Sequence, residues 1–269
     1  MKKIIILALF AISLTLGITS CSKKNNDVIT PANTFVIVPG AWQGPSAWQS
    51  VKADLEAKGQ NVILIQLAGH ESDQTDPSTI TMDVYRDQVV SAINKVNGKV
   101  ILVGHSLGGM IVSAVAEEIP AKIQRLVYIA AYVPVSGQSL LDLAQTDAGS
   151  LLTPALSFPT PYTLDVTHSQ ITNIFIQDGT TAEQNLVLTN YKVEPAIPFT
   201  QPVTLTTANY GTVSKYYIHT EQDHAITPDL QNRMVTAAGI KNTYQLNTSH
   251  SPFLSKPDSV TTMLLNIAK

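Results

Sequence analysis

The sequence predicts an α/β protein: a mostly parallel sheet of about six strands flanked by helices, with a small, mainly helical cap. Short apolar runs alternate with segments of helical periodicity along most of the chain. One of these runs, at residues 100–103, leads directly into a serine between glycines. The alternation is broken once, between about residues 134 and 202, where Thr, Pro, Gln and Leu become frequent.

The first half of the sheet is predicted from three apolar runs, at residues 35–38, 62–65 and 100–103. The helix between the first two is expected to start at Ser46, where Ser46-Ala47-Trp48-Gln49 fits a capping box, and to stop at Gly59. The second helix follows apolar positions from Met82 to Val96 and ends at Asn97-Gly98. A third helix, at residues 110–119, follows the third strand.

The second half contains strands at residues 126–129, 215–219 and 243–246, with helices at 228–238 and from about Lys256. The region from about 134 to 202 contains two short helical patterns, 140–144 and 182–188. An unstructured loop of that length is uncommon in a compact domain. An insertion at this point lies over the carboxyl ends of the strands, where α/β proteins bind ligands, so we expect a cap over a substrate pocket.

The segment Gly104-His105-Ser106-Leu107-Gly108 is a G-x-S-x-G pattern between a predicted strand and a predicted helix. In that context the pattern indicates a nucleophile elbow, a strained turn that exposes the serine hydroxyl above the sheet. Ser106 is therefore the predicted nucleophile. The side chain of His105 is expected to point into the scaffold.

A serine nucleophile needs a base and an acid that orients the base, in the chain order Ser, Asp or Glu, His in this architecture. His250 is the predicted base because it lies in the loop between the last strand and the last helix. His224 is its main competitor, but that choice would reverse the usual order. Of the other histidines, His70 follows an earlier strand, and the last two, His168 and His219, lie in the cap and in a strand.

Asp223 is the predicted acid, because it follows the strand at 215–219 and precedes the helix at 228. Glu221 and Asp229 are the nearest substitutes. The oxyanion hole requires two backbone N–H donors. One is expected from Leu107, directly after the nucleophile, and the other from Ala41 in the turn Pro39-Gly40-Ala41-Trp42.

With these parts placed, residues 34–269 resemble the α/β-hydrolase superfamily, and more narrowly its small-cap esterases related to plant methylesterases and hydroxynitrile lyases. The segments that carry the resemblance are FVIVPGAWQGPSAW at 35–48, LAGHESD at 67–73, GHSLGGM at 104–110, LVYIAAYVP at 126–134, FIQD at 175–178 and SHSPFLSKP at 249–257. The resemblance implies the same triad, Ser106, Asp223 and His250, with Ala41 and Leu107 as oxyanion donors.

The sequence departs from the family pattern at two positions. Pro39 stands where the family usually has a histidine before the glycine of the oxyanion turn. Ser251 stands where the lyases carry a lysine that binds cyanide, which argues against cyanohydrin cleavage. The serine nucleophile also argues against the haloalkane dehalogenases and epoxide hydrolases of this fold, which use an aspartate.

The expected activity is hydrolysis of small or medium-sized carboxylic esters through an acyl-enzyme, without a metal or organic cofactor. A thioesterase, amidase or lactonase with the same triad, or a ligand-binding, receptor-like protein, are the alternatives. A net charge of −3 offers no basic face for nucleic acid. The oligomeric state is left open. Candidate pocket-lining residues are Trp42, Leu140, Leu141, Phe158, Tyr162, Ile174 and Phe175.

The N-terminal segment resembles a bacterial lipoprotein signal peptide. Lys2-Lys3 precedes a 15-residue apolar stretch from Ile4 to Ile18, shorter than the roughly 20 residues of a membrane span. Ile18-Thr19-Ser20-Cys21 resembles a lipobox and contains the only cysteine of the chain. We therefore expect a signal peptide at 1–20, a lipidated Cys21 with a tether at 21–33, the hydrolase domain at 34–269, and a membrane-anchored protein facing the periplasm or cell surface.

Overall fold

The computed structural model describes residues 32–269. The predicted signal peptide, the lipidated Cys21 and most of the tether lie outside the described residues. Among those described, no helix combines the length and the apolar character needed to cross a membrane.

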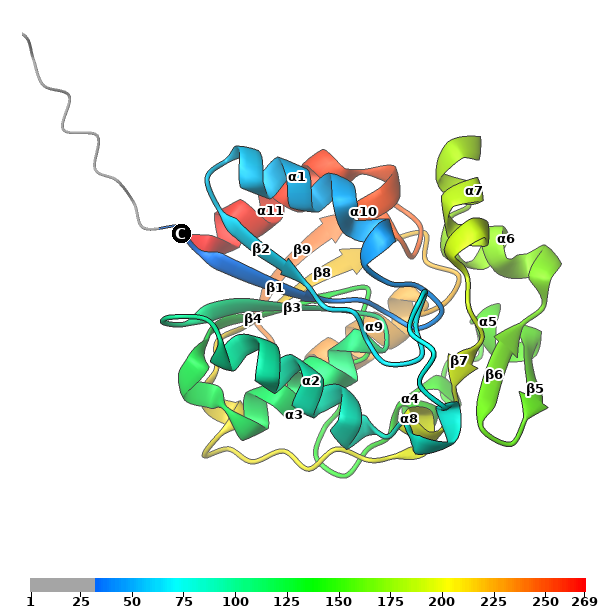
Figure 1. Ribbon diagram of the computed structural model, residues 1–269, viewed down its shortest axis with the longest axis horizontal. Helices are drawn as coiled ribbons and strands as arrows, with labels where there is room; N and C mark the ends of the chain where they lie inside the picture. Colours follow the sequence, from blue (N-terminus) through cyan, green and yellow to red (C-terminus); the bar gives the residue numbers. More distant parts are fainter. Residues whose placement is uncertain (1–31) are drawn as a thin grey trace, which may run out of the picture. The chain divides into compact units, whose positions relative to one another are not determined.

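The core of the domain is a six-stranded sheet in the order β2-β1-β3-β4-β8-β9 (Figure 1). All five neighbouring pairs are parallel. The strands are β1 Thr34–Val38, β2 Asn61–Leu64, β3 Val100–His105, β4 Ile123–Ile129, β8 Lys215–Thr220 and β9 Asn242–Leu246. The predicted α/β class and the six strands are therefore confirmed.

Helices cover both faces of this sheet. On one face α1, Gln49–Ala57, packs beside α11, Pro257–Ala268, and on the other α2, Met82–Asn94, packs beside α3, Gly108–Glu118 (Figure 1). The helix α9, Pro228–Ala237, packs against β8. Because both faces are covered, β3 is buried along its whole length, which explains why it reads as a continuous apolar run in the sequence.

The start of the first helix differs from the prediction. A 3₁₀ turn, η1 Pro45–Trp48, precedes α1, and Ser46 caps neither element. The hydroxyl and the backbone N–H of Ser46 instead donate to Glu71 Oε1, at 2.6 and 2.9 Å. The predicted capping box is therefore wrong, because a carboxylate from another loop takes the serine hydroxyl.

The chain leaves the main sheet after β4 and returns to it at β8, and the cap lies between them (Figure 1). The cap helices are α4 Leu140–Ala144, α5 Leu152–Ala155, α6 Ile171–Phe175, α7 Thr181–Asn190 and α8 Ile197–Thr200. The cap also holds a three-stranded antiparallel sheet that the sequence did not predict, formed by β5 Leu156–Thr160, β6 Thr163–Val166 and β7 Glu194–Pro195. These strands are short, and β5 is largely exposed and contains Pro159, so no apolar run marks them.

Short elements complete the fold. They are the 3₁₀ turns η2 Pro77–Thr79, η3 Pro120–Lys122, η4 His168–Gln170 and η5 Tyr210–Thr212, and the helix α10 Pro252–Ser255. The α10 turn directly follows the loop that carries the predicted base. The carboxyl ends of β1, β3, β8 and β9 all open toward the cap, so the loops that follow these strands meet there (Figure 1).

Candidate active site

Ser106 occupies the sharp turn between β3 and α3. Its φ of 52° lies in the left-handed region, which costs a non-glycine residue roughly 1–3 kcal/mol. The flanking glycines permit this turn: a Cβ on Gly104 would lie 2.6 Å from the Gly108 carbonyl oxygen, and one on Gly108 would lie 2.7 Å from that of Val38. The segment therefore has the geometry of a nucleophile elbow.

The predicted acid and base lie together at the ends of β8 and β9. The Nδ1 of His250 is 2.8 Å from Oδ2 of Asp223, and both side chains are buried. The aspartate also accepts hydrogen bonds from the Thr220 hydroxyl at 2.8 Å and from the backbone N–H groups of Ala225 and Ile226 at 2.8 and 2.9 Å. These donors stabilise an ionised carboxylate in a fixed orientation.

A carboxylate at Nδ1 requires that nitrogen to donate, so a neutral His250 carries its lone pair on Nε2. Within residues 32–269, no protein group is hydrogen-bonded to this Nε2 or to the Ser106 hydroxyl. The base is nevertheless tied to the elbow, because His105 Nε2 donates to the His250 carbonyl oxygen at 2.9 Å and the two rings lie 4.6 Å apart. Burial first, and then the neighbouring His250, lower the pKa of His105 well below its ordinary value. His105 thus stays neutral and points into the scaffold, as predicted.

The alternative acids and base lie elsewhere. Glu221 and Asp229 are exposed, and Asp229 pairs with Arg233 at 2.9 Å. The ring of His224 is hydrogen-bonded to the backbone oxygen of Asn173 at 2.8 Å. Of the candidates weighed from the sequence, Asp223 is the one that contacts His250.

A carboxylate from the cap holds the loop that carries His250. Asp178, between α6 and α7, accepts the backbone N–H of Ser249 at 3.1 Å and the hydroxyl of Ser255 at 2.9 Å. It also accepts the Ser249 hydroxyl. Asp178 ends the segment FIQD at 175–178, but no sequence signal indicated its role.

The predicted oxyanion donors belong to two segments: Leu107 to the elbow itself and Ala41 to the turn after β1. We call residues 39–43 the oxyanion turn. A Cβ on Gly40 would lie 2.7 Å from Cβ of Ser106, so the turn packs directly against the nucleophile. The backbone N–H groups of Ala41 and Leu107 are buried, and neither donates to a protein acceptor within residues 32–269. Both amides are therefore available to a developing oxyanion.

Trp42, the next residue of the oxyanion turn, is held by the cap at three points. Its backbone N–H donates to Glu194 Oε2 at 2.7 Å, its indole N–H donates to the Leu164 carbonyl oxygen at 3.3 Å, and its own carbonyl accepts the Lys192 N–H at 3.4 Å. Its φ of 60° is again in the left-handed region. The cap therefore holds a strained residue directly beside Ala41.

Glu194 belongs to a second buried histidine–carboxylate pair, which the sequence analysis did not identify. The Nε2 of His70 is 3.0 Å from Glu194 Oε1, and its Nδ1 is 2.6 Å from the Gln43 carbonyl oxygen. The hydroxyl of Tyr85 lies 3.4 Å from the same Glu194 oxygen. His70 and Glu194 are each about 1–2% exposed, so the pair is isolated from bulk water.

A small apolar cavity of about 40 Å³ opens beside Ser106, between the oxyanion turn and the cap. Of the candidate lining residues, Trp42, Leu140 and Leu141 do line it, whereas Phe158 and Tyr162 are 69% and 48% exposed. The remaining lining residues are Ala41, Leu107, Tyr132, Ala144, Gln145, Leu152, Thr153, Leu156 and Phe199. The cavity suits a small apolar group next to the nucleophile.

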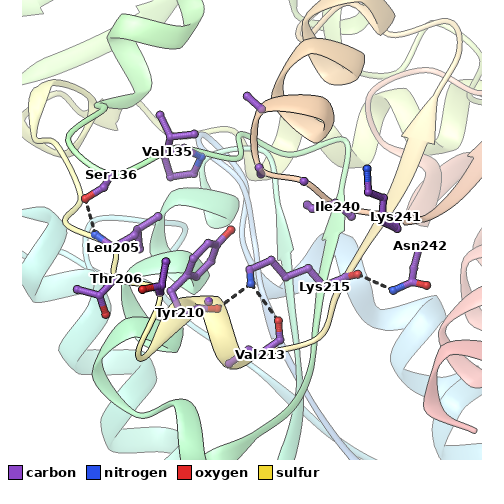
Figure 2. Close-up of a pocket in the computed structure, with 16 residues that line it drawn as sticks. Val135, Ser136, Leu205, Thr206, Tyr210, Val213, Lys215, Ile240, Lys241 and Asn242 are labelled. Carbon is purple, nitrogen blue, oxygen red and sulfur yellow. Dashed lines mark hydrogen bonds between the residues drawn. The ribbon is translucent and has the colours of Figure 1, made fainter.

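A larger pocket of about 470 Å³ lies at the amino ends of β8 and β9 and contains none of the triad residues (Figure 2). Its Lys215 ammonium donates to the carbonyl oxygens of Tyr210 and Val213 at 2.7 and 2.9 Å (Figure 2). That cation is therefore already engaged by the protein. Within residues 32–269, no group of three or more His, Cys, Asp or Glu side chains is arranged to hold a metal ion.

Comparison with known proteins identifies the family of the domain. The family profile described as "Alpha/beta hydrolase family" matches residues 35–262. A chloroplastic protein of Arabidopsis thaliana, assigned as methylesterase 11, is 32% identical over an alignment of 250 residues. The alignment covers 88% of this chain and 64% of that protein. The chain thus spans less than two thirds of the length of that relative. "Methylesterase 7" of the same plant is 27% identical over 91% of this chain and 98% of its own.

Among solved structures, polyneuridine aldehyde esterase superimposes with a TM-score of 0.81 at 22% identity. The match covers 88% of this chain and 100% of that one. At this level of identity the likeness concerns the fold.

Proposed function

Because the chain belongs to the α/β-hydrolase family, we propose that its elbow serine hydrolyses carboxylic esters of small or medium-sized molecules. The single observation that carries this proposal is the arrangement around Ser106. A buried Asp223–His250 pair is tied to the elbow through His105, and two unpaired backbone amides and an apolar cavity lie at the strained serine. The methylesterase relatives support an ester as the substrate.

In the first half of the reaction, the Ser106 oxygen attacks the ester carbonyl carbon while His250 Nε2 takes the hydroxyl proton. The carbonyl oxygen becomes an oxyanion and receives hydrogen bonds from the amides of Ala41 and Leu107. The carbon–oxygen bond to the alcohol then breaks, and His250 returns the proton to the departing alkoxide. Asp223 holds the imidazole in the required tautomer and stabilises the imidazolium that forms.

In the second half, a water molecule attacks the acyl-enzyme and gives its proton to His250. The same two amides hold the second oxyanion, and the bond between the acyl carbon and Ser106 breaks as the serine recovers its proton. The carboxylic acid leaves, and the triad returns to its starting state. The cycle requires only ester and water.

Hydrolysis of p-nitrophenyl esters of increasing acyl length by the purified protein tests this proposal. We expect turnover that Ser106→Ala abolishes and that favours short acyl chains, because the cavity beside Ser106 is small. The Asp229→Asn variant is a matched control, because that exposed carboxylate pairs with Arg233 outside the site. Absence of Ser106-dependent turnover on every ester would contradict the esterase. Parallel assays on thioesters, amides and lactones separate the alternative acyl transfers.

We further propose that Cys21 carries a lipid anchor that places the domain at a bacterial membrane, facing the periplasm or the cell surface. The lipobox-like residues 18–21 support this proposal. Several acyl chains on one residue give stable membrane binding, whereas a single chain is marginal. Metabolic labelling with a fatty acid analogue is expected to mark the wild type and not Cys21→Ala. An unlabelled wild type would contradict the anchor.

A further inference from the structure

The His70–Glu194 pair lies behind the oxyanion turn and takes no part in the reaction described above. We propose that Glu194, supported by His70, is a positioning residue that holds the oxyanion turn in its working conformation from the cap. This inference rests on the proposed esterase function. Neither side chain is required to touch the substrate.

The pair holds two consecutive residues of the oxyanion turn. Glu194 Oε2 accepts the Trp42 N–H at 2.7 Å, and His70 Nδ1 donates to the Gln43 carbonyl at 2.6 Å. The contact between Glu194 Oε1 and His70 Nε2, at 3.0 Å, links these two anchors. One buried pair therefore fixes both a donor and an acceptor of the turn's backbone.

The hydrogen bond from the Trp42 N–H to Glu194 fixes the orientation of the peptide group between Ala41 and Trp42. Ala41 is the predicted oxyanion donor. The peptide is rigid, so its orientation restricts the conformation of Ala41 on one side. The packing of Gly40 against Ser106 restricts it on the other. Without an acceptor, the buried Trp42 N–H would be unpaired and its left-handed conformation would lose support. The Ala41 amide would then no longer be held in place.

The anchor crosses from the cap to the body of the domain. Glu194 lies on β7 of the cap, whereas Trp42 and His70 belong to loops that follow β1 and β2. The seating of the cap and the shape of the oxyanion hole are therefore coupled through one carboxylate. Opening of the cap at β7 would release the turn.

The hydrogen bonds of His70 favour its charged form. Both ring nitrogens face acceptors, the Gln43 carbonyl and the Glu194 carboxylate. Burial disfavours the imidazolium, but attraction to Glu194, these hydrogen bonds and the more distant Glu71 outweigh it, so the pKa of His70 is raised above 6.5. The other titratable group facing the ring is Tyr85, whose pKa burial raises well above its usual value, so it stays neutral.

Two substitutions of Glu194 test the proposal. Glu194→Ala removes the acceptor of the Trp42 N–H, and we expect kcat to fall about 10- to 100-fold with KM changed less than about threefold, since a misplacement of ~1 Å costs about 100-fold. Glu194→Gln keeps an amide oxygen for Trp42 and an NH₂ group for a neutral His70. We expect it to restore kcat to within about fivefold of the wild type.

A trifluoromethyl ketone provides a readout specific to the oxyanion hole, because serine adds to it and forms a stable oxyanion. Its affinity is expected to fall in Glu194→Ala in parallel with kcat/KM. Glu117→Ala is the matched control: Glu117 accepts the backbone N–H groups of Thr206 and Tyr210 on another loop, away from the triad. We expect it to lower stability while kcat and ketone affinity stay unchanged. Equal behaviour of the two alanine variants, normalised to folded enzyme, would overturn the proposal.

Amide hydrogen exchange at Trp42 separates this inference from the proposed function. We expect fast exchange in Glu194→Ala and slow exchange in the wild type, whether or not either turns over an ester. Unchanged exchange overturns the inference, whereas absence of Ser106-dependent turnover in the wild type overturns the esterase.

If Glu194→Ala does not fold, Glu194→Gln carries the test through its pH profile. In the wild type, kcat is expected to decline as the pH rises through the raised pKa of His70, and this decline is expected to be absent in Glu194→Gln. Coincident profiles would overturn the proposal.

Discussion

The domain contains two buried histidine–carboxylate pairs with nearly the same N···O distance. They differ in the hydrogen-bond partner of the second ring nitrogen of the histidine. In the Asp223–His250 pair, at 2.8 Å, the far nitrogen of the histidine is bonded to no protein group of the described domain. In the Glu194–His70 pair, at 3.0 Å, the far nitrogen meets the Gln43 carbonyl. The second ring nitrogen of His250 can therefore accept a proton from a neighbouring group, whereas both ring nitrogens of His70 already have hydrogen-bond partners.

The role that a buried histidine–carboxylate pair can take depends on whether the second ring nitrogen of the histidine is free to form another hydrogen bond. His250 keeps one lone pair available for a hydroxyl, which a general base requires. Both N–H groups of His70 are used within the protein, which suits an anchor. In the proposed reaction, the Asp223–His250 pair serves the proton transfer and the Glu194–His70 pair holds the turn that carries Ala41.

The largest predicted difference between the two pairs is the loss of kcat when the carboxylate of each pair is replaced by its amide. Asp223→Asn places an NH₂ group against His250 Nδ1, so the lone pair moves to Nδ1 and the wrong tautomer faces Ser106. We expect kcat to fall by about 10⁴-fold. The same change at Glu194 is expected to cost less than about fivefold, because His70 has no proton to transfer. Steady-state kinetics on one p-nitrophenyl ester measures both.

The control for this contrast is Ser106→Ala, alone and combined with Asp223→Asn. Residues that act as a unit show non-additive losses, so the double variant is expected to be no slower than Ser106→Ala. A loss in Glu194→Gln as large as that in Asp223→Asn would break the distinction between the two pairs.

The Asp223–His250 pair was predictable because its parts are marked by local sequence. Each lies in a loop after a recognisable strand. The order of the triad along the chain favoured His250 over His224, and the place of Asp223 between a strand and a helix favoured it over Glu221 and Asp229. The backbone donors to Asp223 are also local: Ala225 and Ile226 lie within three residues of it. Strand, turn and helix signals fixed the main sheet in the same way.

The Glu194–His70 pair was not predictable because its partners are far apart in sequence. Glu194 is 124 residues from His70 and 152 residues from Trp42. It lies on a two-residue strand of a cap sheet that no apolar pattern marks. Only the tertiary arrangement brings these groups together. The Ser46 cap failed for the same reason, since Glu71 reaches it from a separate loop.

The pH dependence of stability tests the charge of the second pair. A raised pKa for His70 means that its stabilisation is fully present below 6.5 and is lost as the pH rises through the folded-state value. His70→Gln leaves Glu194 buried without its cation, which typically destabilises by about 3–5 kcal/mol. Urea unfolding is expected to show that deficit below pH 6.5 and a deficit that shrinks as the pH is raised above 6.5. A deficit independent of pH would contradict the charged pair.

The last and smallest loss concerns kcat when the contact between the cap and the loop that carries His250 is weakened. Asp178 is a cap carboxylate, like Glu194, but it holds the loop that carries His250. Asp178→Asn keeps one acceptor oxygen, either for the Ser249 amide together with the Ser255 hydroxyl or for the Ser249 hydroxyl. We therefore expect kcat to fall only about threefold to tenfold as the loop loosens. Ser255→Ala, which removes a single bond to Asp178, is the matched control and is expected to change kcat less than twofold. If Asp178→Asn leaves kcat unchanged, Asp223 and His105 position His250 without the cap, and the cap holds only the oxyanion side of the site. If kcat falls as expected, the cap holds both sides, and its seating governs proton transfer as well as oxyanion binding.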